Sequence, residues 1–290
     1  LLMGLRMKGE TVDEIAAAAK VMRDLSTKVT INDTSHLIDT CGTGGDGIQT
    51  FNVSTVCAFV AAAAGAKVAK HGGRSVSSTC GSADVLEALG VNVNLSSEQV
   101  AKCVDSIGIG FMFAPNHHSA MKHAAPVRRE MGIRTLFNLL GPMTNPAGAK
   151  RQVMGVFHQD LTLLLAQVLQ RLGSTHVMVV HGADGMDEIS VSDITYATLL
   201  INGKITDFEI NPEDYGIPMA SKDDIIGEGP EFNAKLTRDI LSKKIVGAKL
   251  DIVLLNTAAA LIIDEKARDF KDGIDIAKAA IISGAAQAKL

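Results

Sequence analysis

The segment that decides the fold runs from residue 36 to residue 79 and reads HLIDTCGTGGDGIQTFNVSTVCAFVAAAAGAKVAKHGGRSVSST. A short apolar run at 36–39 leads into a glycine-rich turn at 42–47, and a second apolar run at 66–70 ends at another glycine turn. Between them, residues 53–64 are mostly small or β-branched, which suits a helix packed closely on a sheet. This order predicts a strand, a loop, a helix and a second strand, the unit from which parallel sheets are built.

Short apolar runs alternate with helical patterns over the rest of the chain. The pattern predicts an α/β fold in which helices flank a mostly parallel central sheet. Further strands are expected at 110–114, 151–157 and 175–181, followed by a hairpin within 189–210 that turns at Asn202 and Gly203. Helices are expected at 11–25, 82–89, 97–107, 116–140, 160–172, 231–243, 250–264 and 273–283.

Two helical stretches interrupt the alternation and predict a small, discontinuous helical domain. We expect this domain to contain residues 1–32 plus about 115–145, and an α/β domain to contain 33–114 plus 146–290. The chain opens with Leu1 and Leu2, without an initiator Met, inside an amphipathic pattern. We therefore expect the N-terminal part of the helical domain to be missing.

Composition and charge disfavour several classes of protein. The net charge of −4 and the isoelectric point near 6.1 argue against a general DNA-binding protein. With no Trp and two Tyr, the chain lacks an aromatic platform for single-stranded nucleic acid. The apolar run at 53–64 is shorter than the ~20 residues that cross a bilayer. Four cysteines without a CxxC pair are typical of reduced thiols, so we expect a cytoplasmic protein.

The glycine loops lie in a window without negative charge, since no carboxylate occurs between Gly47 and Ala83. Glycine lets the backbone approach a ligand closely, and amides at a helix start point toward an anion. The two loops therefore predict a site for a phosphate-rich ligand. The polar and basic residues of the window are Asn52, Ser54, Thr55, Lys67, Lys70, His71, Arg74, Ser75, Ser77, Ser78 and Thr79.

The first loop, 42–47, also matches the pattern GxGxxG. A dinucleotide site needs an acid about 20 residues further on, and residues 60–70 contain none. A Walker A loop is excluded because no Gly-Lys-Ser or Gly-Lys-Thr follows. Taken alone, the loop is also compatible with a tight structural turn.

Asp187 and Glu188 follow the strand expected at 175–181, at the end where open α/β sheets bind ligands. Adjacent acids on a loop usually face solvent, but carboxylate oxygens also suit a magnesium ion that bridges to phosphate. Arg128 lies in the helical stretch 116–140. The pattern leaves open whether Arg128 lies on a solvated face or clamps a substrate carboxylate.

Taken in order, these motifs resemble the anthranilate phosphoribosyltransferase family of tryptophan biosynthesis. The motifs are CGTGGDG at 41–47 with NVST at 52–55, KHGGRSVSS at 70–78, HHSAMKHAAPVRREMGIRTLFNLLGPMTNP at 117–146 and VVHGADGMDE at 179–188. The resemblance covers essentially the whole chain. It implies a small helical domain plus a large α/β domain, as in class III phosphoribosyltransferases, and a homodimer.

The resemblance also implies an activity and its site. Phosphoribosyl pyrophosphate and anthranilate would react, with Mg²⁺ as cofactor, to give N-(5-phosphoribosyl)anthranilate and pyrophosphate. Anthranilate would contact Gly42, Gly73 and Arg128, and Mg²⁺ would be held by Ser54, Asp187 and Glu188. Lys70 would act as the catalytic residue by stabilising charge on the departing pyrophosphate. Phosphoribosyl pyrophosphate would lie on Gly42, Gly45, Asp46, Thr50, Asn52, Val53, Ser54, Thr55, Lys70, His71, Gly72, Gly73, Arg74, Ser75, Val76, Ser77, Ser78 and Ser82.

The chain departs from the family pattern at Gly73, where the family usually has Asn, and at Ser119, where it usually has Pro. The first departure puts the affinity or identity of the acceptor in doubt. Three alternatives therefore stay open: a transferase for another aromatic acceptor, a pyrimidine nucleoside phosphorylase of the same fold, and a non-catalytic paralogue that binds nucleic acid. The serine run at 75–78 and the Asp187-Glu188 pair weigh against the phosphorylase, and the acidic pI weighs against the nucleic-acid binder.

Overall fold

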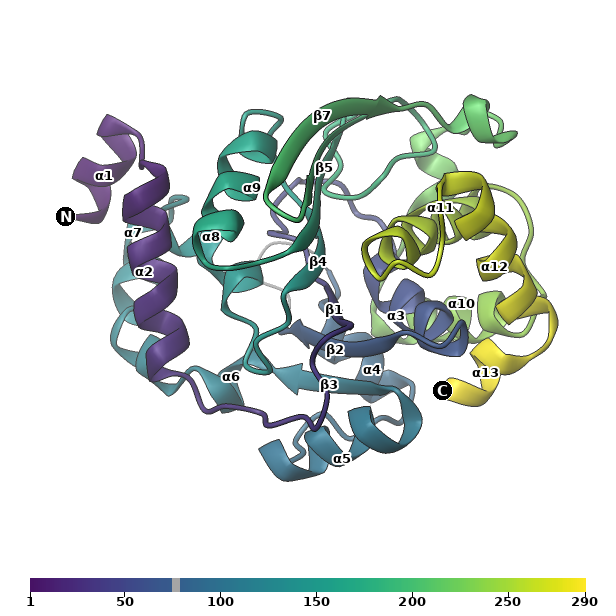
Figure 1. Ribbon diagram of the computed structural model, residues 1–290, viewed down its shortest axis with the longest axis horizontal. Helices are drawn as coiled ribbons and strands as arrows, with labels where there is room; N and C mark the ends of the chain where they lie inside the picture. Colours follow the sequence, from purple (N-terminus) through teal and green to yellow (C-terminus); the bar gives the residue numbers. More distant parts are fainter. Residues whose placement is uncertain (75–78) are drawn as a thin grey trace.

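The computed structural model describes residues 1–74 and 79–290, and its centre is one seven-stranded sheet (Figure 1). The strand order is β3-β2-β1-β4-β5-β6-β7. The first five strands of this order are parallel to one another, and the pairs β5–β6 and β6–β7 are antiparallel. The strands are β1 (Leu37–Thr40), β2 (Lys67–Gly72), β3 (Ile109–Phe113), β4 (Arg151–Gly155), β5 (His176–Gly182), β6 (Thr195–Ile201) and β7 (Lys204–Ile210). The predicted α/β class with a mostly parallel sheet is confirmed.

The order of the strands places a topological switch point at β1. The chain proceeds from β1 to β2 and β3 on one side, then returns to β4 and β5 on the other. Ile38 of β1 pairs with Val68 of β2 and with Arg151 of β4. Open α/β sheets bind ligands outside the carboxyl ends of strands at such a point. The first glycine loop, which follows β1, therefore lies where a ligand is expected.

Helices cover both faces of the sheet. Figure 1 shows α3 and α10 to α13 on one side, and α2, α8 and α9 on the other. The helices are α1 (Leu2–Lys8), α2 (Val12–Leu25), α3 (Val53–Ala63), α4 (Ser82–Ala88), α5 (Ser97–Ile107), α6 (Ala114–His117), α7 (Ala125–Met131), α8 (Phe137–Leu140), α9 (Leu161–Arg171), α10 (Pro230–Leu241), α11 (Ala248–Ile263), α12 (Phe270–Ile282) and α13 (Ala285–Lys289). Short 3-10 turns are η1 (Ser119–His123), η2 (Gly141–Thr144), η3 (Pro212–Tyr215) and η4 (Lys222–Ile225).

Local signals account for several element boundaries. Thr11 caps α2, and its hydroxyl and the Glu14 side chain form the capping box that the sequence predicts. The expected hairpin joins β6 to β7, and its turn residues Asn202 and Gly203 have φ of 48° and 85°, as a type I′ turn requires.

The helical stretch expected at 116–140 is broken in the structure. It forms the short elements α6, η1, α7 and α8. Pro126 occupies the first turn of α7, and Gly132 ends α7 with a left-handed φ of 61°. Each of these residues favours a helix end over a helix interior, so one continuous helix was the wrong expectation.

The α2 helix packs on the broken stretch and on the sheet layer together. Ile15 and Ala19 share a buried cluster with Leu139 of α8, Met143 of η2 and Leu165 of α9. The division into a helical domain of 1–32 plus about 115–145 and an α/β domain stays a prediction. No helix of the described ranges is long and apolar enough to cross a membrane.

Candidate active site

The conformation of the first glycine loop, 42–47, requires glycine at several positions. Gly44, Gly45 and Gly47 have φ of 64°, 77° and 79°, a region that other residues rarely adopt. A Cβ on Gly42 would lie 2.7 Å from Oδ2 of Asp187. The loop is therefore shaped to let its backbone face the acidic loop that follows β5.

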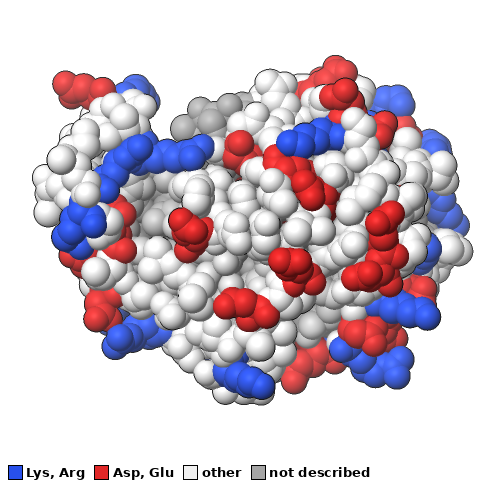
Figure 2. Space-filling view, turned by 90° about the horizontal axis from the view of Figure 1, so that it is seen from above, with Lys and Arg blue, Asp and Glu red and all other residues white. Residues whose placement is uncertain are grey.

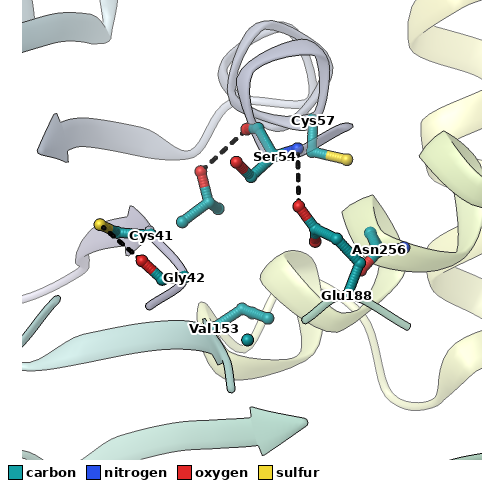
Figure 3. Close-up of a pocket in the computed structure, with 9 residues that line it drawn as sticks. Cys41, Gly42, Ser54, Cys57, Val153, Glu188 and Asn256 are labelled. Carbon is teal, nitrogen blue, oxygen red and sulfur yellow. Dashed lines mark hydrogen bonds between the residues drawn. The ribbon is translucent and has the colours of Figure 1, made fainter. Parts of the chain in front are cut away.

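The acidic loop meets the glycine loop and the start of α3. Gly44 N donates to Oδ2 of Asp187 at 2.7 Å, and Asp187 N donates to Oδ2 of Asp46 at 3.4 Å. Ser54 N, in the first turn of α3, donates to Oε1 of Glu188 at 3.2 Å (Figure 3). The structure thus brings together the three residues predicted as magnesium ligands, and their neighbours on the glycine loop.

The acids of this loop are crowded together and partly buried. Burial, and secondly the charge of Asp46, raises the pKa of Asp187. Burial, and secondly the charge of Asp187, raises the pKa of Glu188 to about 8, although Lys70 partly offsets the rise. A divalent cation would relieve this repulsion, and carboxylate oxygens are ligands that Mg²⁺ prefers.

The residues present fit a magnesium ion shared with a substrate better than a closed protein cage. Within 1–74 and 79–290, no three His, Cys, Asp or Glu side chains gather as a complete metal site. Mg²⁺ usually needs only one or two carboxylates when phosphate oxygens and water complete its shell. Asp187 and Glu188 supply such a pair beside a helix start and an amide-lined loop.

Lys70 lies in β2 beneath this meeting point and is 3% exposed. Its ammonium donates to Oγ of Ser54 at 3.2 Å and to the carbonyl of Thr40. The cation is therefore aimed at the start of α3, where the predicted phosphate and metal residues lie. The narrow pocket between these elements is lined by Gly42, Ser54, Glu188 and Asn256, among others (Figure 3).

The second glycine loop is held against the start of α4. Gly73 O accepts from Ser82 Oγ at 3.3 Å and from Ala83 N at 3.1 Å. Arg74 forms ion pairs with Asp84 and Glu87 of α4, at 2.8 and 2.6 Å. The predicted contacts of Ser75, Val76, Ser77 and Ser78 lie outside the described residues.

Four further predicted phosphate residues lie in or just before the first turn of α3. Asn52 donates to Cys80 O at 3.0 Å and accepts from Asn233 Nδ2 at 3.1 Å, which ties the start of α3 to α10. Thr50 forms an isolated bridge with Ile226. Val53 and Thr55 are both buried in the first turn of α3.

His71 faces a second histidine. Its backbone N–H donates to Oδ1 of Asp39 at 3.1 Å, and its Nε2 lies 3.2 Å from Nε2 of His118. Burial lowers the pKa of His71 to about 3 and that of His118 to about 4. These lowered pKa values keep both rings neutral at pH 7, so one Nε2 donates to the other.

The arginine that contacts the glycine loop is one that sequence reasoning missed. Arg134 donates to Gly45 O and lies 4.2 Å above the ring of Phe157. Arg128, which the sequence singled out, is half-buried on α7 with its guanidinium 5.5 Å above the ring of Phe137. Arg134 lies within the family motif at 117–146, but its contacts with Gly45 and Phe157 depend on the tertiary structure and were not predicted.

Fold and site together define a glycosyltransferase built from an α/β domain and helices. The family model for the α/β domain of the glycosyl transferase family matches residues 34–287, and that for its helical bundle domain matches residues 1–26. Within this class, the chain belongs to the anthranilate phosphoribosyltransferase family.

Relatives of that family are similar over the whole chain. The anthranilate phosphoribosyltransferase of Methylobacillus flagellatus is 60% identical over 289 residues, which cover 100% of this chain and 84% of the relative. The enzyme from Thermus thermophilus superposes with a TM-score of 0.93 at 42% identity, covering 99% of this chain and 85% of the other. The enzyme from Saccharomyces cerevisiae, in complex with PRPP and Mg, gives a TM-score of 0.91 at 31% identity, covering 99% and 81%.

Proposed function

We propose that this chain transfers the phosphoribosyl group of 5-phosphoribosyl 1-pyrophosphate to the amine of anthranilate. The products are N-(5-phosphoribosyl)anthranilate and pyrophosphate, in tryptophan biosynthesis. The observation that carries the proposal is the meeting of the glycine loop, the start of α3 and the acidic loop, where Gly44 N and Ser54 N reach Asp187 and Glu188. Family membership supports it.

The amides of this site suit a pyrophosphate. The backbone N–H groups of the glycine loop and of the first turn of α3 provide hydrogen-bond donors and the positive end of a helix dipole. In the structure two of these donors, Gly44 N and Ser54 N, hold carboxylates, which occupy the place of anionic oxygens. Ser54, Asp187 and Glu188 would hold Mg²⁺, which neutralises charge on the pyrophosphate.

The chemistry requires charge stabilisation and positioning more than proton transfer. The ribose anomeric carbon loses pyrophosphate and gains the anthranilate nitrogen, so negative charge builds on the leaving group. The proposed role of Lys70 is to stabilise that charge, and its burial and its hydrogen bond to Ser54 Oγ support this role. An aromatic amine is neutral at pH 7, so attack needs no strong general base, and the loops supply orientation.

The identity of the acceptor substrate is the part of the proposal for which a second candidate stays open. Gly42, Gly73 and Arg128 are proposed to contact anthranilate. Gly73, where the family usually has Asn, favours a weakened anthranilate pocket or one adapted to another aromatic acceptor. The alternative of a nucleic-acid-binding protein is disfavoured by the net charge of −4 and the isoelectric point near 6.1. On the face shown in Figure 2, acidic and basic side chains interleave.

We further propose that the chain acts in the cytoplasm as a homodimer. Large apolar side chains on the first two helices are exposed, with Met7 at 82% and Leu25 at 58%, and a second copy could cover them. Sedimentation equilibrium tests this proposal, and a monomer at micromolar concentration would overturn it.

The activity is tested by loss of anthranilate fluorescence on addition of phosphoribosyl pyrophosphate, with Mg²⁺ and with EDTA. Turnover that requires Mg²⁺ supports the proposal. Phosphorolysis of uridine or thymidine in place of this reaction would support the phosphorylase. Turnover of another aromatic amine, with anthranilate inert, would retain the reaction class and change the acceptor.

A further inference from the structure

The acidic loop has no neighbouring strand to satisfy its backbone. It connects β5 to β6, and Asp187 to Ser190 lie outside every ladder of the sheet. Ile189, directly after Glu188, is completely buried. Buried backbone N–H and C=O groups need partners, because an unpaired group costs as much as a lost hydrogen bond. Both backbone polar groups of Ile189 are paired by one side chain.

That side chain is Asn256, in the middle of α11. Its Oδ1 accepts from Ile189 N at 2.9 Å, and its Nδ2 donates to Ile189 O at 2.8 Å. Nδ2 also donates to Ile252 O, one turn earlier on α11, at 2.9 Å. The amide oxygen and both amide hydrogens therefore have hydrogen-bond partners, and the bond to Ile252 O fixes the orientation of the amide relative to α11. Asn256 is 3% exposed in a helix whose other buried residues are nearly all apolar.

The first of these bonds acts on Glu188 directly. The N–H of Ile189 belongs to the peptide unit that begins at the carbonyl of Glu188. A peptide unit is planar, so the hydrogen bond that fixes the N–H of Ile189 also fixes the orientation of the Glu188 carbonyl group. The Glu188 side chain then leaves the backbone toward Ser54 N, 3.2 Å from its Oε1 (Figure 3).

We propose that Asn256 is a positioning residue for the metal site: it fixes the backbone from which Glu188 presents its carboxylate. The amide of Asn256 is occupied by Ile189 and Ile252, so the proposed role is exerted through Glu188. The inference rests on the proposed function, since it assigns Asn256 to the Mg²⁺ site of that reaction. Groups that orient metal ligands in this way typically change metal affinity 10- to 100-fold when they are removed.

The test compares Asn256→Ala with Ile252→Ala in the full chain. Ile252 is fully buried on the same helix, so its variant loosens α11 while the amide stays. Binding of Mn²⁺, a paramagnetic substitute for Mg²⁺, is measured by electron paramagnetic resonance with phosphoribosyl pyrophosphate present and compared with Mn²⁺ and phosphoribosyl pyrophosphate alone; the melting temperature is measured beside it. We expect both variants to melt earlier. Only Asn256→Ala should weaken Mn²⁺ binding, by about 10- to 100-fold.

A second variant keeps the inference testable if Asn256→Ala does not fold. Asn256→Leu keeps the branching of the side chain and a good helix former, and removes the hydrogen bonds to Ile189 and to Ile252 O. It should weaken Mn²⁺ binding as the alanine variant does, and raise the Mg²⁺ concentration that half-saturates turnover while the anthranilate KM stays unchanged.

The outcomes separate this inference from the proposed function. If both Asn256 variants bind Mn²⁺ as the parent does and only melt earlier, Asn256 contributes to stability alone. The inference then fails, while the proposed function stands. If the parent itself shows neither Mn²⁺ binding nor transfer, the proposed function fails, and the role of Asn256 fails with it.

Discussion

The α-carbon of Gly155 lies against the backbone of Asp187: a Cβ at this position would fall 1.5 Å from the Asp187 carbonyl oxygen. Gly155 ends β4, and Asp187 belongs to the loop after the neighbouring β5. The acidic loop can therefore fold back over the sheet only because β4 ends in a residue without a side chain. The close approach places Asp187 over the glycine loop.

Gly155→Ala should consequently displace the acidic loop. The obstacle is backbone, which cannot rotate away as a flexible side chain can, so we expect a loss of at least about 2 kcal/mol in the free energy of unfolding. Urea denaturation measures the loss. The control is Gly141→Ala, where no heavy atom lies within 4 Å and φ is −47°. Equal stability of the two variants would contradict the close contact.

Asp187→Asn combined with Glu188→Gln should abolish Mg²⁺-dependent binding of phosphoribosyl pyrophosphate and make the ligand-free protein more stable at pH 8. In the folded chain burial, and secondly the charge of a neighbouring acid, raises the pKa of Asp187 and raises that of Glu188 to about 8. Both carboxyls hold protons more tightly when folded, so their contribution to stability is present at acidic pH. It is lost as the pH rises through these values.

The melting temperature in EDTA at pH 4 and at pH 8 tests whether the two carboxyls destabilise the folded chain as the pH rises. The double variant should match the parent at the acidic pH, where neutral acid and amide are alike, and should melt later at pH 8. A double variant that melts earlier at both values would assign a structural role to the acids. Calorimetry with phosphoribosyl pyrophosphate, with and without Mg²⁺, tests the binding.

Lys70→Ala should lower kcat by on the order of a hundredfold, the usual effect of removing one stabiliser of transition-state charge. The matched control is Lys67→Ala on the same strand, because its ammonium pairs with Asp33 at the surface, 3.5 Å away. That variant should keep the parent's kcat. An unchanged rate for Lys70→Ala, measured by anthranilate fluorescence, would remove Lys70 from the leaving group.

Gly73→Asn should tighten anthranilate binding if the pocket is an anthranilate site that has lost one side chain. The structure has room for the change: the nearest atom to a Cβ is that of Ala114 at 3.9 Å, and φ lies outside the left-handed region. One added hydrogen bond contributes about 1 kcal/mol, or about fivefold in the anthranilate KM. The KM for phosphoribosyl pyrophosphate should not move.

A higher anthranilate KM in a well-folded Gly73→Asn protein would indicate a pocket adapted to another acceptor. The same measurement with ring-substituted anthranilates would then show which acceptor the pocket prefers.

Several elements were predictable because their signals are local. The strand before the first glycine loop and the helix after it appear as β1 and α3 within one or two residues of expectation. The turn at Asn202 and Gly203 was predictable because few residues other than Asn and Gly tolerate positive φ. The continuous helix expected at 116–140 was wrong, because Pro126 favours a helix start and Gly132 a helix end inside that stretch.

The sequence by itself determined the α/β class, the two glycine loops and the acidic pair, because glycine content, charge and apolar periodicity act within a few residues of the chain. Only the tertiary structure decided that Asp187 reaches Gly44, that Arg134 contacts Gly45 and that Asn256 holds Ile189. These contacts join segments separated by 143, 89 and 67 positions. They depend on the order of strands in the sheet and on which helix covers which face, and packing of the whole chain determines both.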